Sequence, residues 1–321
     1  MKVDTILNNK NYSCFENMIY NLANLFETKH QCIFMDSWSF YYTSNPNIPL
    51  DETLCDNRHL DRSLNDQQSA LLDKYHGLNI EWISVDVSLC KSLVDMIKQN
   101  DTALIIEMDT QYVNWYQLGQ IFDVNHYFLI VYIDDLKDIY CLDGHFSKEL
   151  QKISSVDFNH VKRIGLVKRT PITTVAPSFI QAAKHAAISC NEGSGMLSDF
   201  QMMRLFANDL MDESKLKNIY KPDILNSSTI VRKIHYISNG RHNIYELLES
   251  LNCDNQDLKN YILEALSEII LKWHLINNLM IKWLYQNKVS ILHAVADKFL
   301  EISSIEEKLT DSIISYNEAG V

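Results

Sequence analysis

The chain has 321 residues, of which 46% are hydrophobic and 22% are charged, so it can bury a sizeable core and is long enough for two domains. Its formal net charge of −12 argues against a nucleic-acid-binding protein, because phosphate contacts need clustered lysine and arginine. Neither a signal peptide nor a membrane span is predicted, and the seven cysteines show neither disulfide nor zinc-ligand spacing. We therefore expect a cytoplasmic protein with reduced thiols, without a metal and without nucleic-acid or membrane partners.

The first predicted element is a helix that begins at Cys14, because the apolar residues that follow recur at helical spacing as far as Phe26. Ser13 precedes this helix and Glu16 follows three residues later, a pattern typical of a capping box. Cys14 would then occupy the first helical position, where free N–H groups and the helix dipole stabilise a thiolate. The alternative is a cysteine that packs as a small buried hydrophobe.

The rest of the first half mixes helices and strands. A strand is predicted at 31–42, followed by a loop, and then come a helix from about residue 65 to Gly77, a strand at 79–86, a helix at 88–100 and strands at 102–108, 126–133, 139–143 and 163–169. Helices that come mainly early and antiparallel strands that come late are typical of the α+β class.

A boundary is predicted near residues 169–178, which contain two prolines and a run of threonines. Everything beyond is predicted to be helical, with segments at 179–190, 198–211, 227–238, 243–251, 256–287 and 289–316. We therefore predict a catalytic domain at 1–170 and a helical bundle at 177–321. The wide apolar stripes of the bundle suit a lid, or a surface that docks an acceptor or a carrier.

The second informative stretch begins with His126, which opens one predicted strand, and ends with Asp143, which closes the next. A turn at Asp134-Asp135 returns the chain, so both residues should lie near the same end of a hairpin. There a carboxylate can accept the imidazole N–H and orient the ring. Together with a thiolate they form a complete nucleophilic set. Alternatively, His126 is a satisfied strand-end histidine, the spacing of Asp143 is accidental, or His145 is the base.

The order and context of these residues resemble the papain-like cysteine peptidase superfamily. Within it, the chain looks like the peptidases that trim leader peptides in bacteriocin exporters and the acyltransferases of the butirosin type. The resemblance covers residues 5–170 and implies a papain-like fold, with an N-terminal helix plus an antiparallel sheet, followed by an all-helical domain. It implies that Cys14 is the nucleophile, His126 the base and Asp143 the orienting acid.

Two departures from that family affect the predicted site. The family has an oxyanion-hole glutamine six residues before the nucleophile, where this chain has Asn8. Asparagine has a shorter reach, so Asn8, Asn9 or Asn11 could be the donor, together with the backbone N–H of Cys14. Butirosin-type members are also glycine-rich after the first helix, whereas residues 34–44 contain no glycine. We therefore expect a differently shaped acyl pocket or, alternatively, simple core packing, from the aromatic residues Trp38, Phe40, Tyr41 and Tyr42.

Three functions compete at this point. The first is an amide-forming acyltransferase of natural-product or antibiotic biosynthesis, which takes an acyl group from a carrier-protein thioester and passes it to a small amine. The second is a cysteine hydrolase, either a peptidase or a thioesterase, and the third is a binding protein with an accidental triad. We expect the first, because leader peptidases usually accompany exporters and no membrane segment is predicted here. The acyl group would arrive on the phosphopantetheine of an acyl or peptidyl carrier protein, and the enzyme would need no cofactor of its own.

Overall fold

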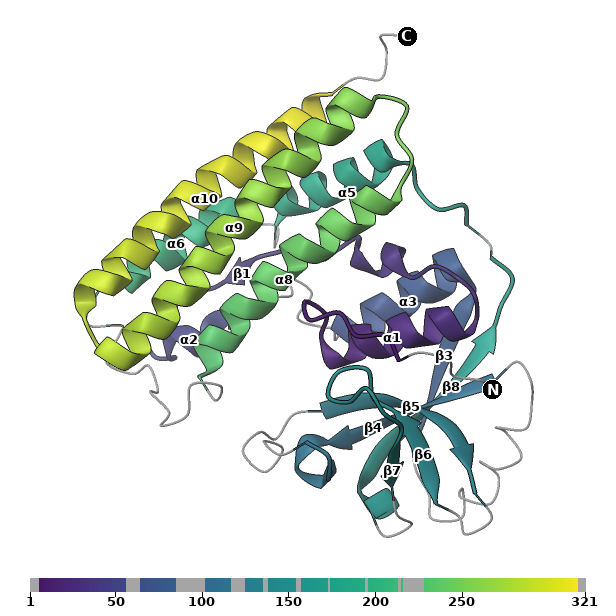
Figure 1. Ribbon diagram of the computed structural model, residues 1–321. Coiled ribbons are helices and arrows are strands. Elements are labelled where there is room, and N and C mark those ends of the chain that lie inside the picture. Colours follow the sequence, from purple (N-terminus) through teal and green to yellow (C-terminus); the bar gives the residue numbers. More distant parts are fainter. Residues whose placement is uncertain are drawn as a thin grey trace. The chain divides into compact units, whose positions relative to one another are not determined.

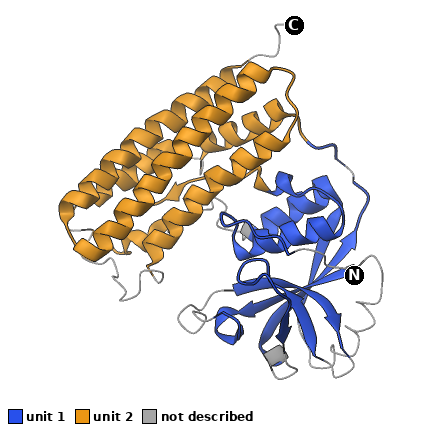
Figure 2. Ribbon diagram, in the orientation of Figure 1, with its two compact units in different colours: residues 1–33, 65–176 blue, residues 34–64, 177–321 orange. Residues whose placement is uncertain are grey.

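The computed structural model describes residues 6–55, 64–84, 102–116, 125–134, 138–153, 157–172, 174–193, 196–212, 215 and 228–316. The chain divides into two compact units (Figure 2). Unit 1 comprises residues 1–33 and 65–176, and unit 2 comprises residues 34–64 and 177–321. Unit 2 therefore includes residues 34–64 from within the predicted first domain, 1–170, as well as the residues that follow the boundary predicted near 169–178.

The helices of unit 1 begin and end where local signals place them. In α1 (Cys14–Leu25), the Ser13 hydroxyl accepts from the Glu16 N–H at 3.2 Å, and the Glu16 carboxylate accepts from the Ser13 N–H at 2.7 Å. The predicted capping box is thus confirmed, with Cys14 as the first helical residue. Helix α3 (Leu64–His76) ends at Gly77, whose φ of +64° favours glycine. The helix predicted at 88–100 lies outside the described residues.

Unit 1 is built around a six-stranded antiparallel sheet with the order β3-β8-β4-β5-β6-β7, so this chain is an α+β protein (Figure 1). The strands are β3 (Leu78–Ser84), β4 (Thr102–Asp109), β5 (Asn125–Ile133), β6 (Ile139–Leu142), β7 (Gln151–Ile153) and β8 (Val161–Arg169). Alternate residues of the central strands form one buried apolar cluster, which includes Met108 and Phe128. Helix α1 contacts the opposite face, where Phe15 meets Tyr127 edge to face at 5.0 Å.

Unit 2 is mainly helical and includes two short strands. Its elements are β1 (Tyr41–Tyr42), α2 (Leu50–Thr53), β2 (Leu54–Cys55), α5 (Phe179–Glu192), α6 (Asp199–Leu210), α8 (Thr229–Ser250), α9 (Gln256–Gln286) and α10 (Val289–Ser315). Helix α10 packs against α5, α6 and α9, and α8 packs against α9. In the part of the chain that the structure describes, no helix combines the length and apolarity needed to cross a membrane.

Two predictions of secondary structure were wrong. Residues 31–42 form no long strand but a 3-10 turn, η1 (Gln31–Phe34), and the two-residue strand β1. The break predicted near Gly240 is also absent, because α8 runs through it without interruption. A Cβ at Gly240 would lie 2.3 Å from the carbonyl oxygen of Ser37. This glycine therefore permits a close approach of two backbones and does not end a helix.

The segment before β1 completes the core of unit 2. Trp38 donates its indole N–H to Glu306 at 2.9 Å, and Glu306 also forms a buried ion pair with Arg241. The Phe40 ring contacts the rings of Phe206, Phe299 and Trp273. The Trp38 and Phe40 side chains are almost fully buried, with exposed fractions of 1% and 0%. The helical unit thus depends on residues from the first half of the chain.

Candidate active site

Cys14 lies at the start of α1 with its side chain partly accessible. Its Sγ is 3.7 Å from the carbonyl oxygen of Asn125, the residue before His126. Among the described residues, none accepts a hydrogen bond from the backbone N–H of Cys14, as expected for the first turn of a helix. A free N–H and an accessible sulfur at one residue are what an acyl acceptor needs.

The β5–β6 hairpin brings His126 to Asp143. Leu129 pairs with Leu142, so the start of β5 and the residue that follows β6 lie at the same end of the hairpin. His126 Nε2 is 2.7 Å from Asp143 Oδ2, and each residue is only 1% exposed. The hairpin geometry predicted from the sequence is therefore confirmed.

The carboxylate of Asp143 accepts from four donors. Oδ2 accepts from His126 and from the indole N–H of Trp115 at 2.7 Å, and Oδ1 accepts from the backbone N–H groups of His145 at 3.0 Å and Phe146 at 3.2 Å. Burial raises the pKa of Asp143, but the bonds from His126, Trp115 and His145 outweigh it and lower this pKa. An ionised Asp143 can only accept, so His126 carries its shared proton on Nε2.

The His126 imidazole is held as a cation next to Cys14. Burial lowers the pKa of His126, but its hydrogen bond to Asp143, a hydrogen bond to the Cys14 side chain and the charges of both partners raise it to about 9. The Phe146 ring stacks on the imidazole with centroids 4.6 Å apart, and Tyr116 stacks on Phe146 at 3.8 Å. His126 is thus positioned to exchange a proton with the Cys14 sulfur.

The predicted oxyanion donor, Asn8, is engaged elsewhere. Its side-chain amide donates to the carbonyl oxygen of Gly144 and, at 3.2 Å, to that of His145. The amide therefore ties the segment before the nucleophile to the loop after Asp143. The role that the sequence assigned to Asn8 stays a prediction, and the contacts of this side chain are those of a structural tie.

Two buried asparagines of α1 hold the same segment in place. Asn17, which is 0% exposed, accepts from the Asn9 N–H at 2.8 Å and donates to the Asn9 carbonyl at 3.0 Å. The Asn21 amide pairs with both the N–H and the carbonyl of Leu7. Neither residue was predicted from the sequence, although amides on the apolar face of a helix are a signal of buried polar contacts.

Gly144 has a packing role that its sequence context did not reveal. A Cβ on this residue would lie 2.4 Å from Asn21 Nδ2 and 2.4 Å from the carbonyl oxygen of Leu7. The residue after Asp143 must therefore be glycine if the acid loop is to lie against the segment that leads to Cys14.

His145, the rival candidate for the base, is neutral. Burial, followed by the nearby charge of His126, lowers the pKa of His145 to about 4. Its Nδ1 lies 3.3 Å from the amide nitrogen of Asn17, so the nitrogen that a base would use is already occupied. His126, and not His145, is paired with the carboxylate and with Cys14.

The carbonyl oxygen beside the Cys14 sulfur belongs to Asn125, whose side chain is held by hydrogen bonds. The side chain of Asn125 donates to Glu107 at 2.6 Å and accepts from Lys162 at 2.7 Å. Glu107 is 2% exposed and also pairs with Arg163. This network fixes the start of β5, and hence the position of the backbone beside the sulfur.

The residues predicted to line an acyl pocket lie in the other unit from Cys14. Trp38 and Phe40 fill the core of unit 2, and Tyr41 pairs with Cys55 in its short sheet. Trp38 and Phe40 therefore have almost no surface to offer a ligand. These two side chains pack in the core, which was the alternative to a pocket-lining role.

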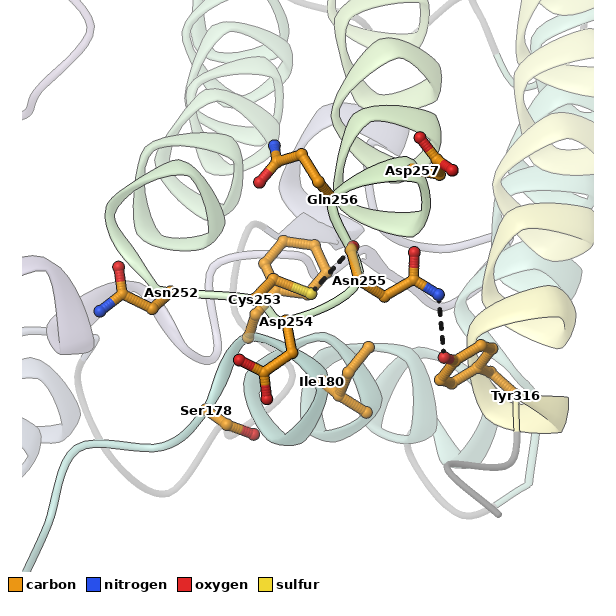
Figure 3. Close-up of a pocket in the computed structure, with 10 residues that line it drawn as sticks. Ser178, Ile180, Asn252, Cys253, Asp254, Asn255, Gln256, Asp257 and Tyr316 are labelled. Atoms are coloured by element: carbon orange, nitrogen blue, oxygen red, sulfur yellow. Dashed lines mark hydrogen bonds between the residues drawn. The ribbon is translucent and has the colours of Figure 1, made fainter. Parts of the chain in front are cut away.

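A pocket in unit 2 lies where α5 and α9 begin (Figure 3). Asn255 donates to the Tyr316 hydroxyl at 3.2 Å, and the Cys253 thiol donates to the Asn255 carbonyl at 3.2 Å. The lining residues include a thiol and two carboxylates but no histidine. The pocket therefore lacks a nucleophilic set like that around Cys14.

Neither a metal nor a relative indicates what the site does. Within the described ranges, no group of three or more histidine, cysteine, aspartate and glutamate side chains could hold a metal ion. No known family model matches the sequence, and no curated protein is similar enough to it to indicate a family. The basis for a functional proposal is therefore the geometry of Cys14, His126 and Asp143.

Proposed function

We propose that this protein is a cysteine-dependent acyltransferase, which takes an acyl group from a thioester onto Cys14 and passes it to an amine. One observation carries the proposal: the His126 imidazole is hydrogen-bonded to Asp143 at 2.7 Å and also to the Cys14 side chain. A thiol, a base and an orienting acid in contact are the requirements for nucleophilic acyl transfer. A nucleophile at a helix start and a base on an antiparallel sheet also support the papain-like fold that the sequence resembles.

The first half of the reaction loads the enzyme. The Cys14 thiolate attacks the thioester carbonyl carbon, and the Cys14 N–H donates to the oxyanion that forms. When the carbon–sulfur bond to the donor breaks, the His126 imidazolium gives its Nδ1 proton to the departing sulfur. The products of this half are an acyl-Cys14 thioester, a free thiol and neutral His126, still oriented by Asp143.

The second half delivers the acyl group. An amine attacks the acyl-Cys14 carbonyl, and neutral His126 takes the proton that the nitrogen must lose. The bond between the acyl carbon and the sulfur breaks, which restores the thiolate and the imidazolium and releases an amide. Because a thioester is converted to an amide, the overall reaction is downhill without ATP or a metal ion.

The donor and the acceptor of the acyl group follow from the resemblance of the chain to the butirosin-type acyltransferases. We propose an acyl or peptidyl carrier protein, whose phosphopantetheine bears the acyl group, and a small amine. The helical unit is then the candidate for docking one of them. The chain also resembles, more narrowly, the amide synthase of closthioamide biosynthesis, although no motif separates that enzyme from the wider family.

The test supplies an acyl-loaded carrier protein with and without a panel of diamines and amino sugars, and reads the products by mass. We expect amide where the panel contains an acceptor, and no product from a Cys14→Ala variant. Cys253→Ala is the matched control, because Cys253 is also a partly exposed free cysteine but lies in unit 2. Free acid formed at a rate that no amine changes would identify a hydrolase with the same triad.

A further inference from the structure

The Asn17 side chain has only one orientation that satisfies its partners. Its Oδ1 lies 2.8 Å from the backbone nitrogen of Asn9, and a backbone N–H can only donate. The amide oxygen must therefore face Asn9. The amide nitrogen then faces the carbonyl oxygens of Asn9, Tyr12 and Ser13, at 3.0 to 3.2 Å, which can only accept.

This orientation fixes the proton on His145. The Asn17 amide nitrogen is 3.3 Å from His145 Nδ1, and an amide nitrogen has only N–H to offer, so Nδ1 must accept. An imidazole whose Nδ1 accepts carries its proton on Nε2. Among the described residues, none accepts a hydrogen bond from that Nε2–H.

The His145 ring lies close to the catalytic base. The His145 ring centroid is 6.2 Å from that of His126, and the Asn17 amide that holds the ring also contacts the carbonyl of Ser13, the residue before Cys14. His145 is partly exposed, so a substrate can reach it. Burial and the cationic His126 keep this imidazole neutral, with a pKa of about 4.

We propose that His145 is a catalytic hydrogen-bond donor, whose Nε2–H stabilises the oxyanion together with the backbone N–H of Cys14. This inference rests on the proposed function and assigns the second oxyanion donor to His145 in place of Asn8, whose amide contacts two carbonyl oxygens. A neutral imidazole serves as a donor without competing with His126 for the proton of the reaction. Asn17 is then a positioning residue, which acts through His145.

The test compares two reactions of Cys14 that differ in whether an oxyanion forms. Acylation by an N-acetylcysteamine thioester passes through a tetrahedral oxyanion, whereas alkylation by iodoacetamide at a saturated carbon does not. The variants are His145→Leu, which has no donor, and His145→Gln, which keeps a side-chain N–H. Both rates are measured on the full chain by intact mass in single turnover, and circular dichroism checks that each variant is folded.

We expect His145→Leu to lower the acylation rate by roughly 10²- to 10³-fold, the usual cost of one oxyanion donor, and to leave the alkylation rate unchanged. His145→Gln should recover part of the acylation rate. Acylation of His145→Leu at the wild-type rate, or an equal loss in both reactions, would overturn the assignment. Wild-type protein that is alkylated but never acylated would overturn the proposed function itself, and this assignment with it.

A second measurement does not depend on activity or on the variants. Nitrogen-15 NMR of protein labelled at histidine should find His145 neutral at pH 6 with its proton on Nε2. A proton on Nδ1 would contradict the assignment, because Nε2 would then be an acceptor with no hydrogen to donate.

Discussion

Replacement of Asp143 by asparagine should destabilise the protein whichever way the new amide turns. One carboxylate oxygen accepts from His126 and Trp115, and the other accepts from the backbone N–H groups of His145 and Phe146. An amide has an NH₂ group at one of these two positions. Beside the two backbone N–H groups, the NH₂ group leaves both of these donors unsatisfied. Beside His126 and Trp115 it leaves the Trp115 N–H unsatisfied, because a neutral His126 can carry its proton on Nδ1 and accept at Nε2. Each unsatisfied donor costs about 1–3 kcal/mol.

The expected loss in the free energy of unfolding for Asp143→Asn is thus roughly 1–6 kcal/mol, measured by urea denaturation followed by circular dichroism. Asp138→Asn is the matched control on the same hairpin, because Asp138 pairs at the surface with Lys152, whose side chain is 52% exposed. A surface pair of this kind contributes at most about 1 kcal/mol. An Asp143→Asn protein that unfolds at the wild-type urea concentration would refute the four-donor description of this carboxylate.

Three further predictions concern the fold. Burial lowers the pKa of His30 and of His76 to about 4, so the unfolded chain takes up protons first as the pH falls below about 6.5. The free energy of unfolding, measured by urea denaturation, should therefore fall between pH 7 and pH 4.5 by up to roughly 3 kcal/mol per histidine. An equal fall in His76→Gln would contradict this. Gly144→Ala should slow acylation of Cys14 and lower the melting temperature, because its Cβ would meet two groups at 2.4 Å; wild-type values for both would count against it. Residues 177–321 alone should not melt cooperatively, whereas the same residues with 34–64 fused ahead of them should, and a cooperative transition in the shorter chain would argue against a shared core.

The sequence was sufficient for those parts of the site that rest on local pattern. The capping box identifies the start of α1, and the outward and returning strands place His126 near Asp143, because each depends on neighbours within a few residues or on one turn. Trp115 could not be found this way. It follows β4 at a distance along the chain from both partners, and a lone tryptophan in a sequence has many ways to be buried.

The assignment of residues 34–64 to unit 2 could not be predicted from the sequence either. Trp38, Phe40 and Tyr42 alternate as core-facing residues do, and this alternation is the same whichever core receives them. The break predicted at Gly240 failed for a related reason. A glycine can end a helix or let two backbones approach closely. Only the contact of Gly240 with the carbonyl oxygen of Ser37, which is far away in the sequence, shows that the second role applies here.

The central claim is that His126, oriented by Asp143, activates Cys14. Its most direct test is limited labelling with iodoacetamide at pH 7, where His126 with a pKa of about 9 is cationic, followed by peptide mapping. The account predicts that Cys14 is labelled before the other cysteines in the wild-type protein, and that a folded His126→Ala variant loses this preference. Equal labelling of Cys14 in the two proteins, or Cys14 among the slowest cysteines of the wild type, would contradict it.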